Sequence, residues 1–259
     1  MLLEEIVSNK MIEIKSLRDQ FKFIKLQNLA DAFPPARDFK ASIKRSGKIS
    51  LIAEVKRASP SAGTLIEKYD PVVIAKEYES AGAAAVSILT DNKFFQGLLA
   101  HLKKVKEGTI IPILRKDFIL DELQILESRL AGADALLLIA GIVENVQLKA
   151  FMAKCREIKL SALVEAHDEK DVEKALECEA DVIGINNRDL NTLKVDFNTS
   201  LNLVSKYPEL KSKILVSESG ISSKSQINEL KSAGFSAVLI GESLIKSNNI
   251  KEKVKELFD

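Results

Sequence analysis

The sequence is poor in cysteine and histidine and contains no tryptophan. Its two cysteines, Cys155 and Cys178, have no CxxC spacing and no neighbouring histidine, so we interpret both as buried structural residues. The two histidines, His101 and His167, each stand alone, and a lone histidine is more often a surface or hydrogen-bonded residue than a metal ligand. The sequence therefore predicts no metal site.

Long apolar runs and an excess of charge of one sign are absent too. Lysine and arginine number 38 against 37 aspartates and glutamates, so no overall field draws the chain to nucleic acid or a membrane surface. No apolar run approaches the roughly 18 residues that a membrane span needs, and the first residues lack a basic segment followed by a long apolar one. We expect a cytoplasmic protein. Without a GxGxxG or GxxxxGK[ST] pattern, no nucleotide cofactor is expected, and any anionic ligand must bind a local site.

Apolar residues make up 46% of the chain, and its 259 residues are close to the roughly 250 that one (β/α)8 barrel requires. We expect one domain over residues 1–259. Several apolar runs are continuous, such as residues 135–139, which is typical of parallel strands buried on both faces. Strands are predicted at residues 50–55, 84–89, 111–114, 135–139, 160–164, 181–185, 213–217 and 237–240.

Amphipathic segments alternate with these strands, for example residues 143–156 and 223–233. Before a strand the chain often carries a short Ala-Gly joint, in which glycine can take the left-handed conformation that ends a helix. The joints contain Gly82, Gly132 and Gly234, with a relative lacking glycine at 179–181. Eight such units predict a closed (β/α)8 (TIM) barrel over residues 49–259, with an open doubly wound sheet as the alternative.

Residues 1–48 precede the first strand and do not fit the repeat. Ile6, Met11, Ile14 and Leu17 recur at helical spacing, and the prolines in residues 33–35 interrupt the pattern. We expect an N-terminal extension of added helices packed on the barrel, with the barrel mouth as one place for them. The last stretch, residues 250–258, is expected to be the final barrel helix.

Ionisable side chains stand where the predicted strands end. Glu54 and Lys56 are two residues apart in a strand and therefore share a face. Lys116 repeats the pattern on the third strand, Glu165 on the fifth, and Asn186 adds a neutral donor and acceptor on the sixth. The alternative is a surface turn with an exposed ion pair. A buried carboxylate needs a partner, however, and two lysines and two glutamates at one mouth would shift each other's pKa.

Glycine turns follow the seventh and eighth predicted strands, at Ser219-Gly220 and Gly241-Glu242. Barrels of this kind commonly hold a phosphate with these two loops, and unpaired N–H groups at a helix start favour a dianion. Each turn alone would be ordinary. Their coincidence predicts a phosphoester ligand.

Seven ordered segments closely resemble the indole-3-glycerol phosphate synthase family, and the likeness runs nearly end to end. It includes PPARDF at 34–39 in the extension. The segments are IAEVKRASPS (52–61), LTDNKFFQG (89–97), LRKDF (114–118), LVEAH (163–167), INNRDL (185–190), SESGI (217–221) and GESL (241–244).

The resemblance implies a cofactor-free lyase of tryptophan biosynthesis that converts 1-(2-carboxyphenylamino)-1-deoxyribulose 5-phosphate to indole-3-glycerol phosphate. Ring closure, decarboxylation and dehydration would follow one another. By motif match Lys116 is the general acid, Glu165 and Glu54 transfer protons and stabilise positive charge, and Lys56 binds the substrate carboxylate. The resemblance also implies substrate contacts by Asn186, Glu218, Arg188, Phe95, Phe118 and Leu190, and phosphate contacts by Ser59, Ser219, Gly220, Gly241 and Glu242.

Two other functions fit the same barrel. One is a sugar-phosphate isomerase such as phosphoribosylanthranilate isomerase, and the other is a phosphometabolite-binding barrel without activity. An isomerase needs one acid, one base and no carboxylate-binding lysine, so the set of two lysines and two glutamates favours the synthase. We expect a small phosphorylated substrate as partner, with no nucleic acid, membrane or fused second barrel. The sequence leaves the oligomeric state open and is compatible with a monomer.

Overall fold

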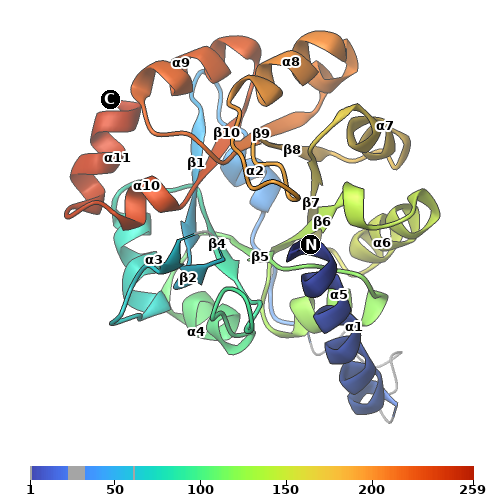
Figure 1. Cartoon of the computed structure of the whole chain (residues 1–259). Helices are drawn as coiled ribbons and strands as arrows, with labels where there is room; N and C mark the ends of the chain where they lie inside the picture. The colour runs from blue at the N-terminus through green and yellow to red at the C-terminus, as the bar shows by residue number, and fades with distance from the viewer. Residues whose placement is uncertain (1, 23–32, 61) are drawn as a thin grey trace.

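Parallel strands close into a barrel in the computed structural model, which describes residues 2–22, 33–60 and 62–259 (Figure 1). The barrel order within these residues is β1-β10-β9-β8-β7-β6-β5-β4. This confirms the predicted (β/α)8 fold and shows that the open sheet was wrong. The barrel strands are β1 (Ser50–Val55), β4 (Ala85–Leu89), β5 (Ile113–Lys116), β6 (Ala135–Ile139), β7 (Ser161–Ala166), β8 (Val182–Asn186), β9 (Ile214–Glu218) and β10 (Ala237–Ile240).

Several strands lie one or two residues further along the chain than predicted. The largest shift is at β5, which was expected at 111–114, because Pro112 has no N–H to donate to the ladder. As a result Lys116, Asn186 and Glu218 are the last residues of their strands, and Glu165 is the last but one of β7. The polar side chains therefore stand on the hydrogen-bonded barrel itself, where the backbone is most rigid.

Helices surround the barrel, and the expected joints between helix and strand are confirmed (Figure 1). Gly82, Gly132 and Gly234 have φ of +94°, +95° and +99°, and Glu179 takes the same left-handed region at +56° where the joint lacks glycine. The helices are α3 (Pro71–Ser80), α4 (Ala100–Gly108), α5 (Glu122–Leu130), η3 (Ala140–Ile142), α6 (Asn145–Glu157), α7 (Glu169–Glu177), α8 (Asn198–Lys206), η4 (Pro208–Ser212), α9 (Lys224–Ala233), α10 (Glu242–Ile245) and α11 (Ile250–Phe258).

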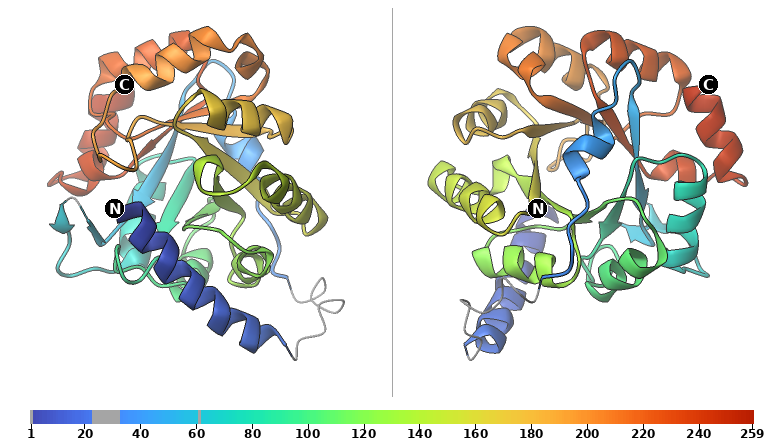
Figure 2. Two further views of the ribbon diagram at one scale, coloured as in Figure 1. Left: turned by 45° about the vertical axis from the view of Figure 1, so that its right-hand side comes forward. Right: turned by 180° about the vertical axis from the view of Figure 1, so that it is seen from behind.

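The N-terminal extension forms two helices at opposite ends of the barrel. Helix α1 (Leu2–Phe21) begins over the mouth, whereas α2 (Phe39–Ile43) lies at the other end, as the rear view in Figure 2 shows. Phe39 and Ile43 are fully buried among the first residues of the strands, so α2 plugs the barrel floor. The expectation of added helices on the barrel is confirmed, but only α1 reaches the mouth.

The buried face of α1 differs in one position from the predicted stripe. Ile6, Ile14 and Leu17 are buried as expected, but Met11 is 52% exposed and Lys10 is buried in its place. A buried ammonium group needs a partner of opposite charge, so Lys10 is expected to lie next to a carboxylate.

The barrel interior is apolar in its lower layers and charged at the top. Ile52, Leu114 and Leu163 fill the inside, each two residues before a predicted catalytic side chain on the same strand. A two-stranded hairpin of β2 (Ala58–Ser59) and β3 (Gly63–Thr64) follows β1 and was not predicted; Ser61, in the motif that ends there, lies outside the described residues. No described helix is long and apolar enough to cross a membrane.

Candidate active site

The barrel mouth contains a cavity of about 490 Å³, a volume typical of small-molecule sites. Every predicted site residue except Glu218 lines it. These residues are Glu54, Lys56, Ser59, Phe95, Lys116, Phe118, Glu165, Asn186, Arg188, Leu190, Ser219, Gly220, Gly241 and Glu242. Folding thus brings together residues that are spread over most of the sequence.

Lys116 is the centre of the charged part of this cavity. Its Nζ lies 2.6 Å from Oε2 of Glu218 and 3.2 Å from Oε2 of Glu165. Burial alone would lower the pKa of Lys116, but the carboxylates of Glu218, Glu165 and Glu54 outweigh burial and raise it. The side chain is therefore an ammonium at neutral pH, which is the state that a general acid needs.

Glu218 lies behind Lys116 and does not line the cavity, unlike the substrate contact expected from the sequence. It is 1% exposed, and burial raises the pKa of Glu218 to about 7, with repulsion by Glu165 adding to the rise and Lys116 opposing it. The space for this carboxylate exists because the neighbouring strand β8 has a glycine two residues before the one that pairs with Glu218, and a Cβ at Gly184 would collide with Oε1 of Glu218. Glu218 therefore holds the ammonium of Lys116 in position through their ion pair.

Glu54 and Lys56 face the same side of β1, as predicted, with Nζ of Lys56 2.7 Å from Oε1 of Glu54. Burial raises the pKa of Glu54, but the two ammonium groups of Lys56 and Lys116 outweigh it and lower the pKa overall. A Cβ on Gly241 would come within 2.6 Å of Oε1 of Glu54. Gly241 thus leaves room for the carboxylate of Glu54 and also forms the turn after β10.

Glu165 has a second partner in His167, which the sequence had left as a lone histidine. The two side chains are two residues apart and so face the same way, with Nε2 of His167 3.1 Å from Oε1 of Glu165 and Nδ1 3.4 Å from Oδ2 of Asp171. Burial opposes the charge of His167, but the two carboxylates raise its pKa to about 10. Burial alone would raise the pKa of Glu165, but Lys116 and His167 outweigh burial and lower the pKa overall.

His167→Asn is expected to flatten the alkaline dependence of stability. Because the pKa of His167 rises from 6.5 to about 10 on folding, its contribution is complete below pH 6.5 and is lost as the pH rises toward 10. Between pH 6.5 and 9.5 the wild type should lose on the order of 2 kcal/mol of unfolding free energy more than the variant, measured by urea titration. His101→Asn is the control, since burial lowers the pKa of His101 and leaves it neutral in this window. Equal losses in wild type and His167→Asn would show that the imidazolium is absent.

The apolar wall of the cavity is larger than predicted. The rings of Phe95 and Phe118 lie 6.3 Å apart between centroids, and Leu190 lines the same cavity. Leu2, Leu3 and Ile6 of α1, together with Leu137, Ile139 and Leu239 of the barrel, also line it. The sequence named the mouth as one place for the N-terminal helices, but it assigned none of their residues to the wall, because they lie outside the repeat that defined the strand ends.

The turns after β9 and β10 form the part of the cavity where the sequence predicts phosphate binding. Ser219 and Gly220 have φ of +66° and +75°, and the first N–H groups of α10 have no acceptor within that helix. The side chain of Glu242 pairs with Lys246 at 2.6 Å and faces Arg188 at 3.9 Å. Lys246 also lines the cavity and was missed by the sequence reasoning; its spacing of four residues from Glu242 was the available signal.

The fold and the site define a class of enzyme: a (β/α)8 barrel whose mouth contains acid–base groups, an apolar wall and the turns after β9 and β10 in one cavity. Within the described residues no group of three or more His, Cys, Asp and Glu is placed to hold a metal ion. A profile of the indole-3-glycerol phosphate synthase family matches residues 3–257. The chain belongs to the indole-3-glycerol phosphate synthase family.

Individual relatives agree with the family match. Proteins named indole-3-glycerol phosphate synthase from Desulforamulus reducens and Caldanaerobacter subterraneus subsp. tengcongensis are 44% and 46% identical to the chain. The alignments cover 99% of this chain and 97% and 99% of the two relatives. The family and the lyase activity expected from the sequence are thereby confirmed, and the isomerase alternative is not favoured.

Among solved structures, a crystal structure of 3-hexulose-6-phosphate synthase matches with a TM-score of 0.62 at 14% identity. The match covers 81% of this chain and 98% of that one. At this identity the likeness concerns the barrel alone.

Proposed function

We propose that the chain closes the indole ring of 1-(2-carboxyphenylamino)-1-deoxyribulose 5-phosphate by acid–base catalysis from the residues of this mouth. The observation that carries the proposal is the Lys116 ammonium, which is held by Glu165 and Glu218 in a cavity that also contains the apolar wall and the turns after β9 and β10. A substrate with an aromatic ring at one end and a phosphate at the other matches such a cavity.

Lys116 is the proposed general acid of ring closure. The ring carbon that bears the carboxylate attacks the ketone, and the carbonyl oxygen takes a proton from the ammonium to become a hydroxyl. The ring nitrogen becomes positive in this step. Glu165 and Glu54, both buried carboxylates with lowered pKa, are charged at neutral pH and stabilise that positive charge.

Carbon dioxide then leaves, and loss of the hydroxyl as water together with a proton from the neighbouring carbon gives the indole. Dehydration requires an acid for the hydroxyl and a base for the carbon proton, and Lys56, Glu54 and Glu165 are the candidates at the mouth. Lys56 is also the ammonium proposed for the substrate carboxylate. Its ion pair with Glu54, the carboxylate proposed to stabilise charge on the ring nitrogen, supports a role at the ring end of the substrate.

The phosphate is proposed to lie against the backbone of Ser219, Gly220 and Gly241, with Ser59, which lines the same cavity, as a further contact. Glu242 would act through its N–H, because its carboxylate already pairs with Lys246. Asn186 and Arg188 complete the substrate contacts. Oδ1 of Asn186 accepts the N–H of Arg188 at 3.0 Å, which fixes both residues at the end of β8.

The proposal is tested by incubating the purified chain with authentic substrate in the presence of a metal chelator and without nucleotide. We expect a gain of indole fluorescence, since the product contains an indole ring and the chain has no tryptophan to mask it. No fluorescence gain would remove the assignment. Phosphoribosylanthranilate serves as the second substrate, and its isomerisation would support the isomerase instead.

The cytoplasmic location stays a prediction.

A further inference from the structure

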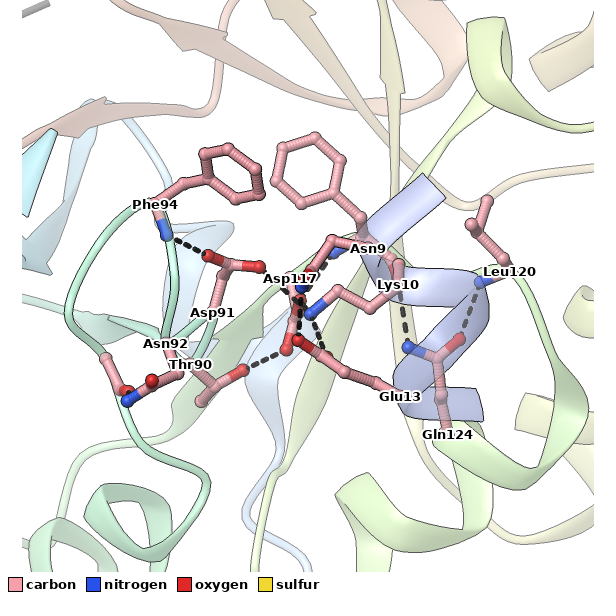
Figure 3. Close-up of polar contacts among 12 residues, drawn as sticks. Asn9, Lys10, Glu13, Thr90, Asp91, Asn92, Phe94, Asp117, Leu120 and Gln124 are labelled. Atoms are coloured by element: carbon pink, nitrogen blue, oxygen red, sulfur yellow. Dashed lines mark hydrogen bonds and ion pairs between the residues drawn. The ribbon is translucent and has the colours of Figure 1, made fainter. Parts of the chain in front are cut away.

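Lys10 on helix α1 is buried against the loops that follow β4 and β5, where its ammonium contacts three carboxylates (Figure 3). Nζ of Lys10 lies 2.7 Å from Oε2 of Glu13, 3.0 Å from Oδ2 of Asp91 and 2.9 Å from Oδ1 of Asp117. Lys10 is 2% exposed, and the side chains of Asp91 and Asp117 are 0% and 2% exposed. A charge as deeply buried as these persists only when it is paired.

The two aspartates belong to the loops that carry functional side chains. Asp117 stands between Lys116 and Phe118, and its Oδ1 accepts the N–H of Phe118 at 2.8 Å. Asp91 follows β4, and its Oδ1 accepts the N–H of Phe94 at 2.8 Å, one residue before Phe95 of the aromatic wall. Lys10 therefore joins the two segments from which Phe95, Lys116 and Phe118 extend.

Asp117 has further partners on its other oxygen, whereas Asp91 depends more on Lys10. Oδ2 of Asp117 accepts hydrogen bonds from Nη2 of Arg115, at 3.0 Å, and from the hydroxyl of Thr90. Oδ2 of Asp91 contacts the ammonium of Lys10 and has no hydrogen-bond partner among the other described residues. Burial raises the pKa of Asp117, but Arg115 and Lys10 outweigh it and lower the pKa to about 2. Asp117 thus faces Lys10 as an anion.

The same lysine places α1 on the cavity. Leu3 and Ile6 precede Lys10 by seven and four residues, so all three lie on one face of the helix, and Leu3 and Ile6 line the cavity. Further along α1, Ile14 and Leu17 are buried and Arg18 pairs with Asp121 at 2.7 Å. The outer half of α1 therefore has its own anchors, and Lys10 anchors the half over the mouth.

We propose that Lys10 is a positioning residue of the active site: its ammonium clamps Asp91 to Asp117, and through them it fixes the aromatic wall and the strand end that carries Lys116, while it seats Leu3 and Ile6 on the cavity. The inference rests on the roles proposed above for Lys116 and the wall. Lys10 does not line the cavity, so it acts through other residues.

Lys10→Met keeps the stem and removes the charge. We expect kcat/KM to fall by about 10- to 100-fold, with part of the loss in KM, because misplacing reacting groups by about 1 Å has a cost of this size. Lys15→Met on the exposed face of α1 is the matched control and should stay within about twofold of the wild type. A folded Lys10→Met variant with the kcat/KM of the wild type would overturn the proposal.

A second variant separates positioning from bulk stability. In Lys10→Met/Asp91→Asn the new amide keeps an oxygen for the N–H of Phe94 and removes the buried negative charge that loses its ammonium partner. We expect this double variant to recover at least about fivefold in kcat/KM over Lys10→Met, measured where all variants are fully folded. If it recovers stability but no activity, Lys10 is only structural and the proposal fails.

Hydrogen exchange of the same variants provides a readout that does not depend on turnover. Lys10→Met should speed amide exchange in residues 2–13, 91–97 and 117–120, while exchange in β7, β8 and β9 stays unchanged. Unchanged exchange in 91–97 and 117–120 would overturn the clamp even if the wild type is active. An inactive wild type whose Lys10→Met variant shows the expected exchange would instead remove the proposed function and leave the clamp standing.

Discussion

Lys116→Met is expected to lower kcat/KM by about 10³- to 10⁴-fold while the barrel remains folded. Methionine keeps the length of the stem but cannot donate a proton, and loss of a general acid has a cost of this order. The fold should survive because Glu218, whose pKa is already about 7, can take up a proton when its ammonium is removed, and His167 still pairs with Glu165. Turnover is measured by indole fluorescence, and folding by circular dichroism and urea unfolding.

Two further variants control this experiment. Lys103→Met removes an exposed lysine and should leave kcat/KM unchanged. Lys116→Arg keeps a positive charge but does not release its proton near neutral pH, so a loss of at least about 100-fold is expected there as well. Turnover like that of the wild type in either substitution of Lys116 would refute the acid role.

Glu165→Gln is expected to lower kcat by about 10²- to 10³-fold with a change in KM of only a few fold. The amide fills the same volume beside Lys116 and His167, but it neither accepts a proton nor offsets positive charge on the ring nitrogen. Steady-state kinetics with authentic substrate separate the two constants.

Glu229→Gln, an exposed substitution on α9, is the matched control and should behave as the wild type. A result in which KM rises while kcat is kept would contradict the catalytic role and make Glu165 a residue of substrate binding alone.

The sequence predicted the barrel because its strands and joints carry strong local signals. Continuous apolar runs such as β6 are typical of parallel strands, and the glycines of the joints do take φ > 0. The error at β5 has a local cause as well. Ile111 extends the apolar run, but Pro112 delays the ladder, and this places Lys116 at the end of the strand rather than in a loop.

The composition of the site was predictable, whereas its internal pairing was not. Strand ends and alternation showed that Glu54, Lys56, Lys116 and Glu165 would meet. Only closure of the barrel decides that Lys116 lies on Glu218, because this contact joins β5 and β9, which are not neighbours in the barrel. The contact of Glu165 with His167 joins residues two apart, so the same alternation could have indicated it.

Lys10 was missed for a different reason. A charged residue within an amphipathic stripe is normally assigned to the solvent face, and Met11 seemed the better apolar match. The partners that draw Lys10 inward, Asp91 and Asp117, lie far along the chain, so no local pattern could indicate them.

The register between β1 and β10 has a consequence for the assembly of activity. The seam pairs Ser50 with Ala237, and beside it the carboxylate of Glu54 fits against Gly241. Both partners come from opposite ends of the barrel sequence, so a refolding intermediate with an unsealed seam has no complete catalytic mouth. We therefore expect turnover to return, after dilution from denaturant, only when β1 pairs with β10, and to return later than the helical ellipticity.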